Sequence, residues 1–251
     1  MNENLAGKVA LVTGGSRGMG AAIAARLAAD GADVAFSYRA DPDEGRKTLA
    51  AIEAAGRRGL VVKADQADEQ QVRTMVQRVG EYFGRLDIVV NNAGVHIGGA
   101  VDAVDRDQGA LDRQLAINLQ GTVRTVVAAM PLLSEGGRIV SIASTGTSHT
   151  KVPFPGLADY MATKAAVVTY AKGWARDLAP RGITVNVVEP GPIDTDMNPA
   201  TSERAAFMTS MVPLGRYGRP EEIAAAVSFL VGPEAAFITG TVLTVDGGFS
   251  A

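Results

Sequence analysis

The sequence predicts a doubly wound α/β fold, in which a parallel β-sheet is covered by helices on both faces. Short apolar runs alternate along the chain with longer amphipathic runs, which is the pattern of alternating strands and helices. Several short runs, such as Val9–Val12, are apolar at every position, as is typical of parallel strands buried on both sides. The 251 residues can bury a full core, and no repeat or linker divides them. We therefore expect one domain over residues 1–251.

The elements follow one another in a regular order along the chain. Seven strands are predicted, at residues 9–12, 34–36, 60–62, 86–90, 138–143, 183–188 and 242–245. Helices are predicted between them, at residues 21–29, 42–55, 69–83, 108–133, 158–178 and 221–230. Ligands of such folds bind at the carboxyl ends of the parallel strands, so the residues after each strand indicate the function.

The composition excludes several classes of protein. Cysteine is absent, which rules out disulfides, thiolate metal sites and a cysteine nucleophile, and we predict no metal site. A net charge of -3, with both signs mixed along the chain, argues against a nucleic-acid binder. The longest uncharged stretch, residues 88–101, is shorter than the roughly 18 residues of a membrane span. Residues 1–8 lack the apolar segment of a secretory signal, so we expect a cytoplasmic protein.

A glycine-rich turn follows the first strand and leads into a helix. Residues 13–20 read TGGSRGMG. Glycines permit a tight turn and let backbone amides approach a pyrophosphate, and the helix N-terminus adds partial positive charge. A turn without a ligand is the alternative. We expect dinucleotide contacts from Gly14, Ser16, Arg17, Gly18, Met19 and Gly20.

The end of the second strand indicates which dinucleotide is preferred. An NAD site places an acid there for the ribose 2′-hydroxyl, whereas an NADP site places an arginine near the 2′-phosphate. This strand ends in Ser37-Tyr38-Arg39 with no acid, and Arg17 could reach the same phosphate. The pair favours NADP(H) over NAD(H). The alternative is two solvated arginines, and Asp41 weakens their field.

Two further strand ends offer polar groups to a cofactor. After the third strand, a carboxylate could accept a proton of the adenine amino group, although a helix N-cap is an equally good interpretation of Asp65 or Asp68. After the fourth strand, residues 91–94 read NNAG, which alone indicates only a turn. From these ends we expect cofactor contacts by Asp65, Gln66, Asn91, Ala93 and Gly94.

A proline–glycine turn follows the sixth strand. It could close over one end of a nicotinamide ring, with Thr195 bonding the carboxamide, and a plain loop is the alternative. We expect cofactor contacts by Pro190, Gly191, Ile193 and Thr195.

Tyr160 and Lys164 are candidate catalytic residues because they share one face of a predicted helix. A free tyrosine has a pKa of about 10, too high for efficient proton transfer at neutral pH. A cation one turn away favours the phenolate and lowers that pKa. Ser144 ends the preceding strand, which places a hydroxyl at the same edge of the sheet.

Together these motifs resemble the short-chain dehydrogenase/reductase family over residues 9–249. The match comprises the glycine turn at 13–20, NNAG at 91–94, Asn118 in a helix, YxxxK at 160–164, PG at 190–191 and DGG at 246–248. The pattern with Thr13 and Arg17 most resembles the NADPH-dependent 3-oxoacyl-(acyl-carrier-protein) reductases. The resemblance implies a Rossmann-type fold and an NADP(H)-dependent enzyme that reduces a ketone to a secondary alcohol by hydride transfer.

The resemblance also implies a role for four residues. Tyr160 would be the general acid in reduction and the base in oxidation, and Ser144 would polarise the carbonyl oxygen. Lys164 would bind the hydroxyls of the nicotinamide ribose and would also lower the pKa of Tyr160. Asn118 would keep a kink in its helix and hold a water that relays protons to Lys164.

The sequence departs from the family pattern between Ser144 and Tyr160. The two lie sixteen residues apart, about three more than the family spacing, and Ser148 lies nearer to it. We choose Ser144 because it directly ends the strand. The longer loop is expected to border the substrate pocket. His149 in this loop and His96 after the fourth strand are in reach of the site, although surface positions are the simpler interpretation.

The resemblance extends to a substrate lid and to self-association. Residues 195–217 would form the lid, and their apolar side chains favour either an apolar carbonyl substrate or simple packing. Small residues along the helix after Tyr160 are typical of a close helix contact between subunits, which implies a dimer or homotetramer. A monomer that buries the same residues is the alternative.

Two other functions remain open on the sequence alone. One is a non-catalytic, nucleotide-binding regulatory protein on the same fold, since fold does not guarantee chemistry. The other is an NAD-dependent alcohol dehydrogenase. The complete set of Tyr160, Lys164, Ser144 and Asn118 argues against the first.

Overall fold

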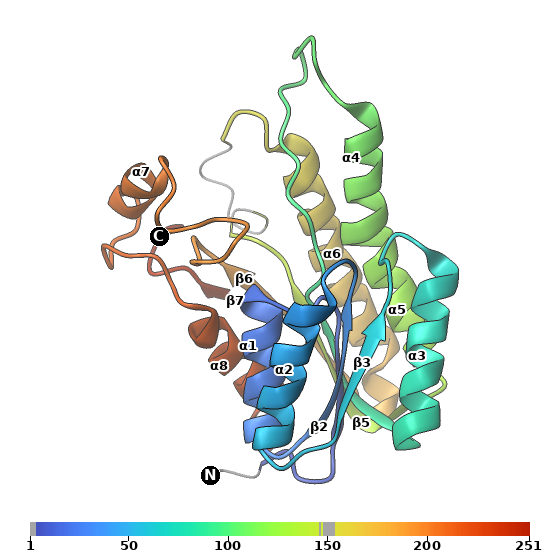
Figure 1. Cartoon of the computed structure of the whole chain (residues 1–251). Helices are drawn as coiled ribbons and strands as arrows, with labels where there is room; N and C mark the ends of the chain where they lie inside the picture. Colours follow the sequence, from blue (N-terminus) through green and yellow to red (C-terminus); the bar gives the residue numbers. More distant parts are fainter. Residues whose placement is uncertain (1–3, 146, 148–153) are drawn as a thin grey trace.

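The computed structural model describes residues 4–145, 147 and 154–251, and these residues adopt the predicted fold (Figure 1). Seven parallel strands form one sheet in this part of the chain. They are β1 (Val9–Val12), β2 (Asp33–Tyr38), β3 (Gly59–Lys63), β4 (Leu86–Asn91), β5 (Leu133–Ile142), β6 (Thr184–Pro190) and β7 (Val242–Val245). The helices are α1 (Gly18–Ala29), α2 (Pro42–Ala54), α3 (Glu69–Phe83), α4 (Gln108–Leu115), α5 (Gly121–Ala129), α6 (Ala158–Asp177), α7 (Ala205–Ser210) and α8 (Pro220–Val231).

The sheet order is β3-β2-β1-β4-β5-β6-β7. The chain therefore winds outward from β1 in one direction and then from β4 in the other. The loops after β1 and β4 leave the sheet toward opposite faces, and a crevice opens between them at the carboxyl edge. This edge is where the sequence motifs were expected to meet.

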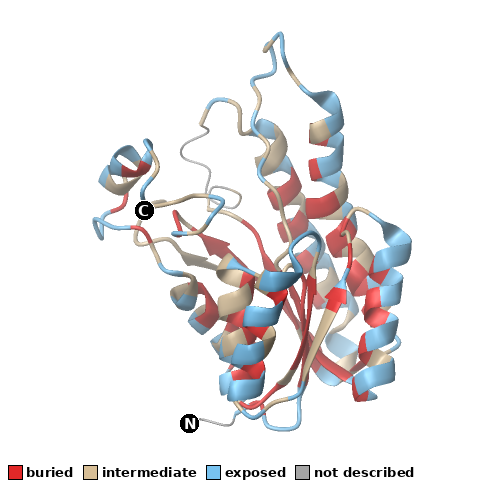
Figure 2. Cartoon of the chain, in the orientation of Figure 1, coloured by how far each residue is buried: buried red, intermediate tan, exposed pale blue. Residues whose placement is uncertain are grey.

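Two hydrophobic clusters cover the two faces of the sheet, and most strand residues are buried (Figure 2). On one face, α1, α2 and α8 pack apolar side chains such as Ile23, Ile52 and Ile223 against the strands. On the other, α3, α5 and α6 contribute Met75, Val126 and Val168 among others. Helices on both faces explain why the strands are apolar at nearly every position.

The prediction of one continuous helix over residues 108–133 is wrong in two respects: the helix is interrupted, and it ends earlier. It is divided by a π-helical segment, η1 (Ala116–Gln120), between α4 and α5. The chain leaves the helix after Ala129, because Leu133 is buried in the core and pairs with Leu86 at the start of β5. The register shifts between Leu86 and Ile88, so β5 begins five residues earlier than its apolar run.

Short polar caps fix several helix starts at the carboxyl edge. Asp41, Asp68 and Asp107 each accept a backbone N–H in the first turn of α2, α3 and α4. The capping interpretation of Asp68 is therefore confirmed. No helix within the described residues is both long and apolar enough to cross a membrane.

Candidate active site

The glycine turn between β1 and α1 has a path that only glycine permits. Gly14 and Gly18 have positive φ angles of 65° and 53°. A Cβ atom on Gly20 would lie 2.1 Å from the Gly14 carbonyl oxygen. The amide of Gly14 donates to Ser37 Oγ at 3.1 Å, which ties the turn to the end of β2. The glycines thus serve the close packing of the turn on itself and bring the N-terminus of α1 to the crevice.

A cavity of about 580 Å³ lies along this turn and the ends of β2, β3 and β4. Most of the residues predicted to bind a cofactor line it. These are Gly14, Ser16, Arg17, Gly18, Met19, Gly20, Arg39, Asp65, Gln66, Ala93, Gly94 and Thr195. The shape and lining fit a dinucleotide, because a glycine turn, a helix N-terminus and two arginines meet in one elongated space.

Several lining residues were not predicted from the sequence. They include Ser37, Tyr38, Ala40, Asp41, Glu44, Ala64, Asn92, Val95, Ile117, Asp196 and Met197. Most are immediate neighbours of the predicted ones at strand ends, so a wider window after each strand would have found them. Ile117, in the π-helical segment, carries no sequence signal of this kind.

The junction between β1 and β4 is held by Thr13 and Asn92. Thr13 Oγ1 accepts the backbone amides of Asn92 and Ala93, both at 3.1 Å. Asn92 Nδ2 donates to the carbonyl oxygens of Thr13 and Gly14, both at 3.0 Å. These four bonds lock the two turns of the crevice together, and they use the second asparagine of the NNAG motif.

The two arginines reach the cavity in different ways. Arg17 forms an exposed ion pair with Asp196, with 3.3 Å between Nη1 and Oδ2. Arg39 lines the cavity near Asp65, since its charge helps to lower the pKa of that carboxyl group. Asp41 also lines the cavity. Both arginines therefore border the cavity, Arg17 beside Asp196 and Arg39 near Asp65.

Asp65 and Gln66 border the cavity, but their side chains already have protein partners. Asp65 pairs with Arg113 at 2.6 Å. Burial raises the pKa of Asp65, but hydrogen bonds from Arg113 and the Ala67 amide and the charges of Arg113 and Arg39 leave it below its ordinary value. Gln66 Nε2 donates to Gly121 O and Thr125 Oγ1 in α5.

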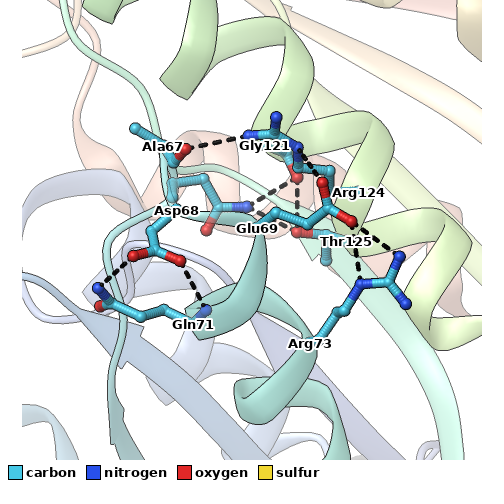
Figure 3. A network of polar contacts seen from close by, with 9 residues as sticks. Ala67, Asp68, Glu69, Gln71, Arg73, Gly121, Arg124 and Thr125 are labelled. Carbon is cyan, nitrogen blue, oxygen red and sulfur yellow. Dashed lines mark hydrogen bonds and ion pairs between the residues drawn. The ribbon is translucent and has the colours of Figure 1, made fainter.

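Side chains connect the loop between β3 and α3 to helix α5 (Figure 3). Arg124 donates to Ala67 O at 3.0 Å, and its Nε lies 3.7 Å from a carboxylate oxygen of Glu69. Glu69 also pairs with Arg73 on α3. The contacts of Arg124 were not predicted from the sequence, because this residue is far from Ala67 and Glu69 in the chain.

Six residues predicted to contact a cofactor do not line the cavity: Tyr160 and Lys164, which are described below, and four others. Asn91 is buried and donates to Ser141 Oγ across the β4–β5 pair. At Gly191 a Cβ would lie 2.6 Å from Asp246, so this glycine accommodates the chain itself. Ile193 packs in the core beside Gly218, and Pro190 ends β6.

Tyr160 lies on the first turn of α6 and is hydrogen-bonded to Ser144 at the end of β5. Part of its side chain stays accessible. Burial raises the pKa of the phenol, and the hydrogen bond with Ser144 lowers it by less, so the pKa lies above its ordinary value. The prediction that Lys164 lowers the pKa of Tyr160 below its ordinary value is therefore wrong for this structure. Ser148 and His149, the alternatives in the longer loop, lie outside the described residues.

Lys164 is buried and donates to a neutral group. Its Nζ lies 2.8 Å from the carbonyl oxygen of Ile142 and 5.9 Å from the centre of the Tyr160 ring. Burial lowers the pKa of Lys164 to about 8. A Cβ on Gly94 would lie 3.3 Å from Nζ, so the NNAG turn passes directly beside the amine.

Asn118 occupies the π-helical segment, which supplies the helix irregularity expected at this residue. Its Oδ1 accepts the Val95 amide at 2.8 Å, and its Nδ2 donates to Val95 O and to Thr163 Oγ1. Asn118 thus joins the NNAG turn to α6. Ser144, Tyr160, Lys164 and Asn118 come together at one end of the crevice, as the sequence predicts.

The charge on Lys164 has a measurable effect on stability. The unfolded pKa is 10.5 and the folded pKa about 8, so the unfolded state binds more protons between these values. The protein should gain stability as pH rises from 8 to 10.5, by roughly 3 kcal/mol at about 1.4 kcal/mol per unit. The Lys164→Met variant should lack this gain, and urea unfolding at pH 7.5 and 9.5 measures it. Parallel pH dependence in the two proteins would contradict the prediction.

Comparison with known proteins agrees with the site. A family model described as enoyl-(acyl carrier protein) reductase matches residues 14–250. A short-chain dehydrogenase of Burkholderia cenocepacia, solved with NADP, is similar with a TM-score of 0.95 and 50% identity, covering 99% of this chain and all of the other. The cyclic-di-GMP-binding biofilm dispersal mediator protein of Escherichia coli is 41% identical over 98% of each chain.

A 3-oxoacyl-(acyl-carrier-protein) reductase of Staphylococcus aureus is 38% identical over 96% of this chain and 97% of its own. Both the family model and the relatives extend over nearly all of the sequence. The fold, the family and the enzyme class predicted from the sequence are therefore confirmed. The chain belongs to the short-chain dehydrogenase/reductase family of oxidoreductases.

Proposed function

We propose that the protein reduces a ketone to a secondary alcohol with NADPH, and that Tyr160 is the general acid. The observation that carries this assignment is the hydrogen-bonded pair of Tyr160 and Ser144 beside a buried amine and a dinucleotide-shaped cavity. Residues 1–251 would act as one dinucleotide-binding and catalytic domain, since both hydrophobic clusters pack on the same sheet.

The protonation of Tyr160 suits the reductive direction. A phenol with a raised pKa holds its proton at neutral pH and can deliver it to the carbonyl oxygen. Ser144, bonded to the same hydroxyl, is placed to polarise that oxygen. Lys164 offers its amine at the end of the crevice, where the ribose hydroxyls of the cofactor would bind. NADPH supplies the hydride when it is bound.

Replacing Tyr160 tests the assignment directly. Tyr160→Phe removes the acidic proton and keeps the ring, so turnover should fall at least about 100-fold, the lower range for a general acid. Affinity for NADPH, measured by fluorescence titration, should stay near that of the wild type. Ketone-dependent NADPH oxidation that survives the change would rule out Tyr160 as the acid.

Two observations support NADP(H) over NAD(H). Arg17 and Arg39 both line the cavity, and no acid ends β2. A structurally similar protein is bound to NADP.

Removing Arg39 should change the cofactor preference. Arg39→Ala should raise the KM for NADPH about 10-fold, the low end for a charge-assisted bond at an exposed site, and leave that for NADH nearly unchanged. Arg78→Ala, at an exposed position of α3 outside the cavity lining, is the control. Equal effects on NADH and NADPH would refute the phosphate contact. Running the same assays in the direction of alcohol oxidation tests the NAD-dependent alternative.

The lid over residues 195–217 is also part of the proposal. It contains α7, and the side chains of Met197 and Phe207 are more than half exposed in it. Phe207 approaches Phe154, which precedes α6, with 6.4 Å between ring centres. Apolar groups from the lid and from the segment just before α6 thus meet, which suits a mainly apolar carbonyl compound.

We further propose a homodimer or homotetramer that assembles through α5 and α6. Val127 and Tyr170 are 59% and 44% exposed on these helices. Small residues lie beside them, and a Cβ on Gly173 would meet no atom within 4 Å. An open stripe of small residues next to exposed apolar ones suits a second copy of the chain. Cytoplasmic location stays an expectation from the sequence.

A charged side chain on this stripe should disrupt assembly and spare the fold. Gly173→Arg meets free space within one chain, but would place a long cation in the helix contact. Light scattering should then show a molar mass closer to the 26.0 kDa of one chain than the wild type shows. Lys172→Ala, at the position before Gly173 on α6, serves as the control. Gly56 is also open, but its positive φ makes an arginine there strained, so it is not used.

A nucleotide-binding regulatory role is the second candidate. The Escherichia coli relative is named for binding cyclic di-GMP, and the arginine-lined cavity could take a nucleotide phosphate. Calorimetric titration of cyclic di-GMP, with and without saturating NADPH, separates the two. Binding without any ketone-dependent NADPH oxidation would favour the regulatory role.

A further inference from the structure

His96 lies directly against the proposed acid. The centres of the His96 and Tyr160 rings are 4.9 Å apart, and the ring planes meet at 88°. This edge-to-face arrangement is a favourable contact between aromatic rings. His96 itself is exposed to solvent.

The backbone on both sides of His96 is held by buried amides. The Val95 amide donates to Asn118 Oδ1 at 2.8 Å, and the Ile97 amide donates to Gln114 Oε1 at 2.6 Å. Gln114 and Asn118 are at most 1% exposed and lie four residues apart. An exposed loop rarely has two such anchors around one residue. They fix the point from which the imidazole projects.

A second set of bonds joins the same loop to the residues just before Tyr160. The Gly99 amide donates to Gly156 O at 2.9 Å. Arg106 donates from Nη2 to both carboxylate oxygens of Asp159 at 2.9 Å, and from Nη1 to Gly99 O at 3.3 Å. The loop that carries His96 and the helix start that carries Tyr160 therefore move as one unit.

We infer that His96 is a positioning residue for Tyr160: its imidazole ring holds the phenol ring in the orientation that delivers the proton. The inference rests on the proposed role of Tyr160. Ser144 fixes the hydroxyl end of the side chain, and His96 restrains the ring itself. The helix backbone and the Ser144 hydrogen bond hold the two ends of the side chain, and the contact with His96 restrains rotation of the ring about the axis between them.

The electrostatics agree with a purely steric role. Burial, together with the charge of Arg204, lowers the pKa of His96, so the imidazole is neutral at pH 7. Lys164 Nζ lies 5.9 Å from the centre of the phenol ring. His96 thus adds no charge beside Tyr160 in the neutral range, and a non-titrating ring should replace it.

The test compares two substitutions that differ only in keeping a ring. His96→Ala should lower kcat about 5-fold, the factor that corresponds to about 1 kcal/mol for an aromatic pair, with KM and NADPH affinity near wild type. His96→Phe should recover most of this loss. Acetophenone and ethyl acetoacetate serve as ketone probes. Val104→Ala, at an exposed position of the same loop, is the matched control and should behave as wild type.

Several outcomes would overturn the inference. They are a wild-type kcat in His96→Ala, an equal loss in His96→Phe, or a change confined to KM, which would make His96 a substrate contact. Gln114→Met should lower kcat with His96 present, and have little further effect in the His96→Ala background. Additive losses would show that the anchor does not act through His96.

A readout without turnover separates this inference from the proposed function. Tyrosine ring signals in a 13C-labelled protein can be assigned to Tyr160 by their loss in Tyr160→Phe. His96→Ala should shift and broaden them, and His96→Phe should keep them sharp. Unchanged signals in His96→Ala would refute the positioning role. Inactivity of the wild type toward every ketone, with the expected spectral change, would refute only the proposed reaction.

Discussion

The hydrogen bonds between Thr13 and Asn92 are the constraint on which the site depends. The sheet order reverses between β1 and β4, so the loops after these two paired strands diverge where the strand pairing ends. Thr13 Oγ1 accepts two backbone amides there, and Asn92 returns two bonds to the glycine turn. Since Thr13 is 1% exposed, loss of its hydroxyl would leave the amides of Asn92 and Ala93 without that acceptor in a buried position.

The same junction determines where the proposed catalytic groups lie. Gly94 follows Asn92 by two residues and passes beside Lys164 Nζ and Asn118 Oδ1. Asn118 bonds both Val95 and Thr163, and so fixes α6 relative to this turn. The cofactor end and the proton-transfer end of the crevice are thus connected through only a few residues of the chain after β4.

How much could be predicted from the sequence depended on how local the determining interaction was. The strands, the glycine turn and the caps of α2 and α3 were predictable, because neighbouring residues decide them. The partner of Asp65 was not, because Arg113 lies 48 residues away and only the fold brings it close. The early start of β5 was missed because a register shift opposite Leu86 has no apolar alternation to reveal it. The close approach at Gly191 was predicted, but the partner is Asp246 rather than a ligand.

The two titratable groups of the site are both displaced from their ordinary behaviour by burial. Burial raises the pKa of Tyr160 and lowers that of Lys164, so both groups are pushed toward their neutral forms. The sequence predicts a fully charged Lys164 that lowers the pKa of Tyr160. The depth at which the Lys164 amine is buried is not predictable from the sequence, because it depends on the turn at Gly94. A charged amine kept in such surroundings costs stability, as is common where chemistry takes place.

The ion pair between Arg17 and Asp196 joins the glycine turn to the beginning of the 195–217 segment. Both side chains are about two-thirds exposed, so the pair contributes at most about 1 kcal/mol. A phosphate that takes Arg17 as its partner releases Asp196 at little cost. The affinity for the cofactor and the conformational freedom of residues 195–217 are then thermodynamically linked. A change that favours release of Asp196 from Arg17 must raise the affinity for the cofactor by the same factor.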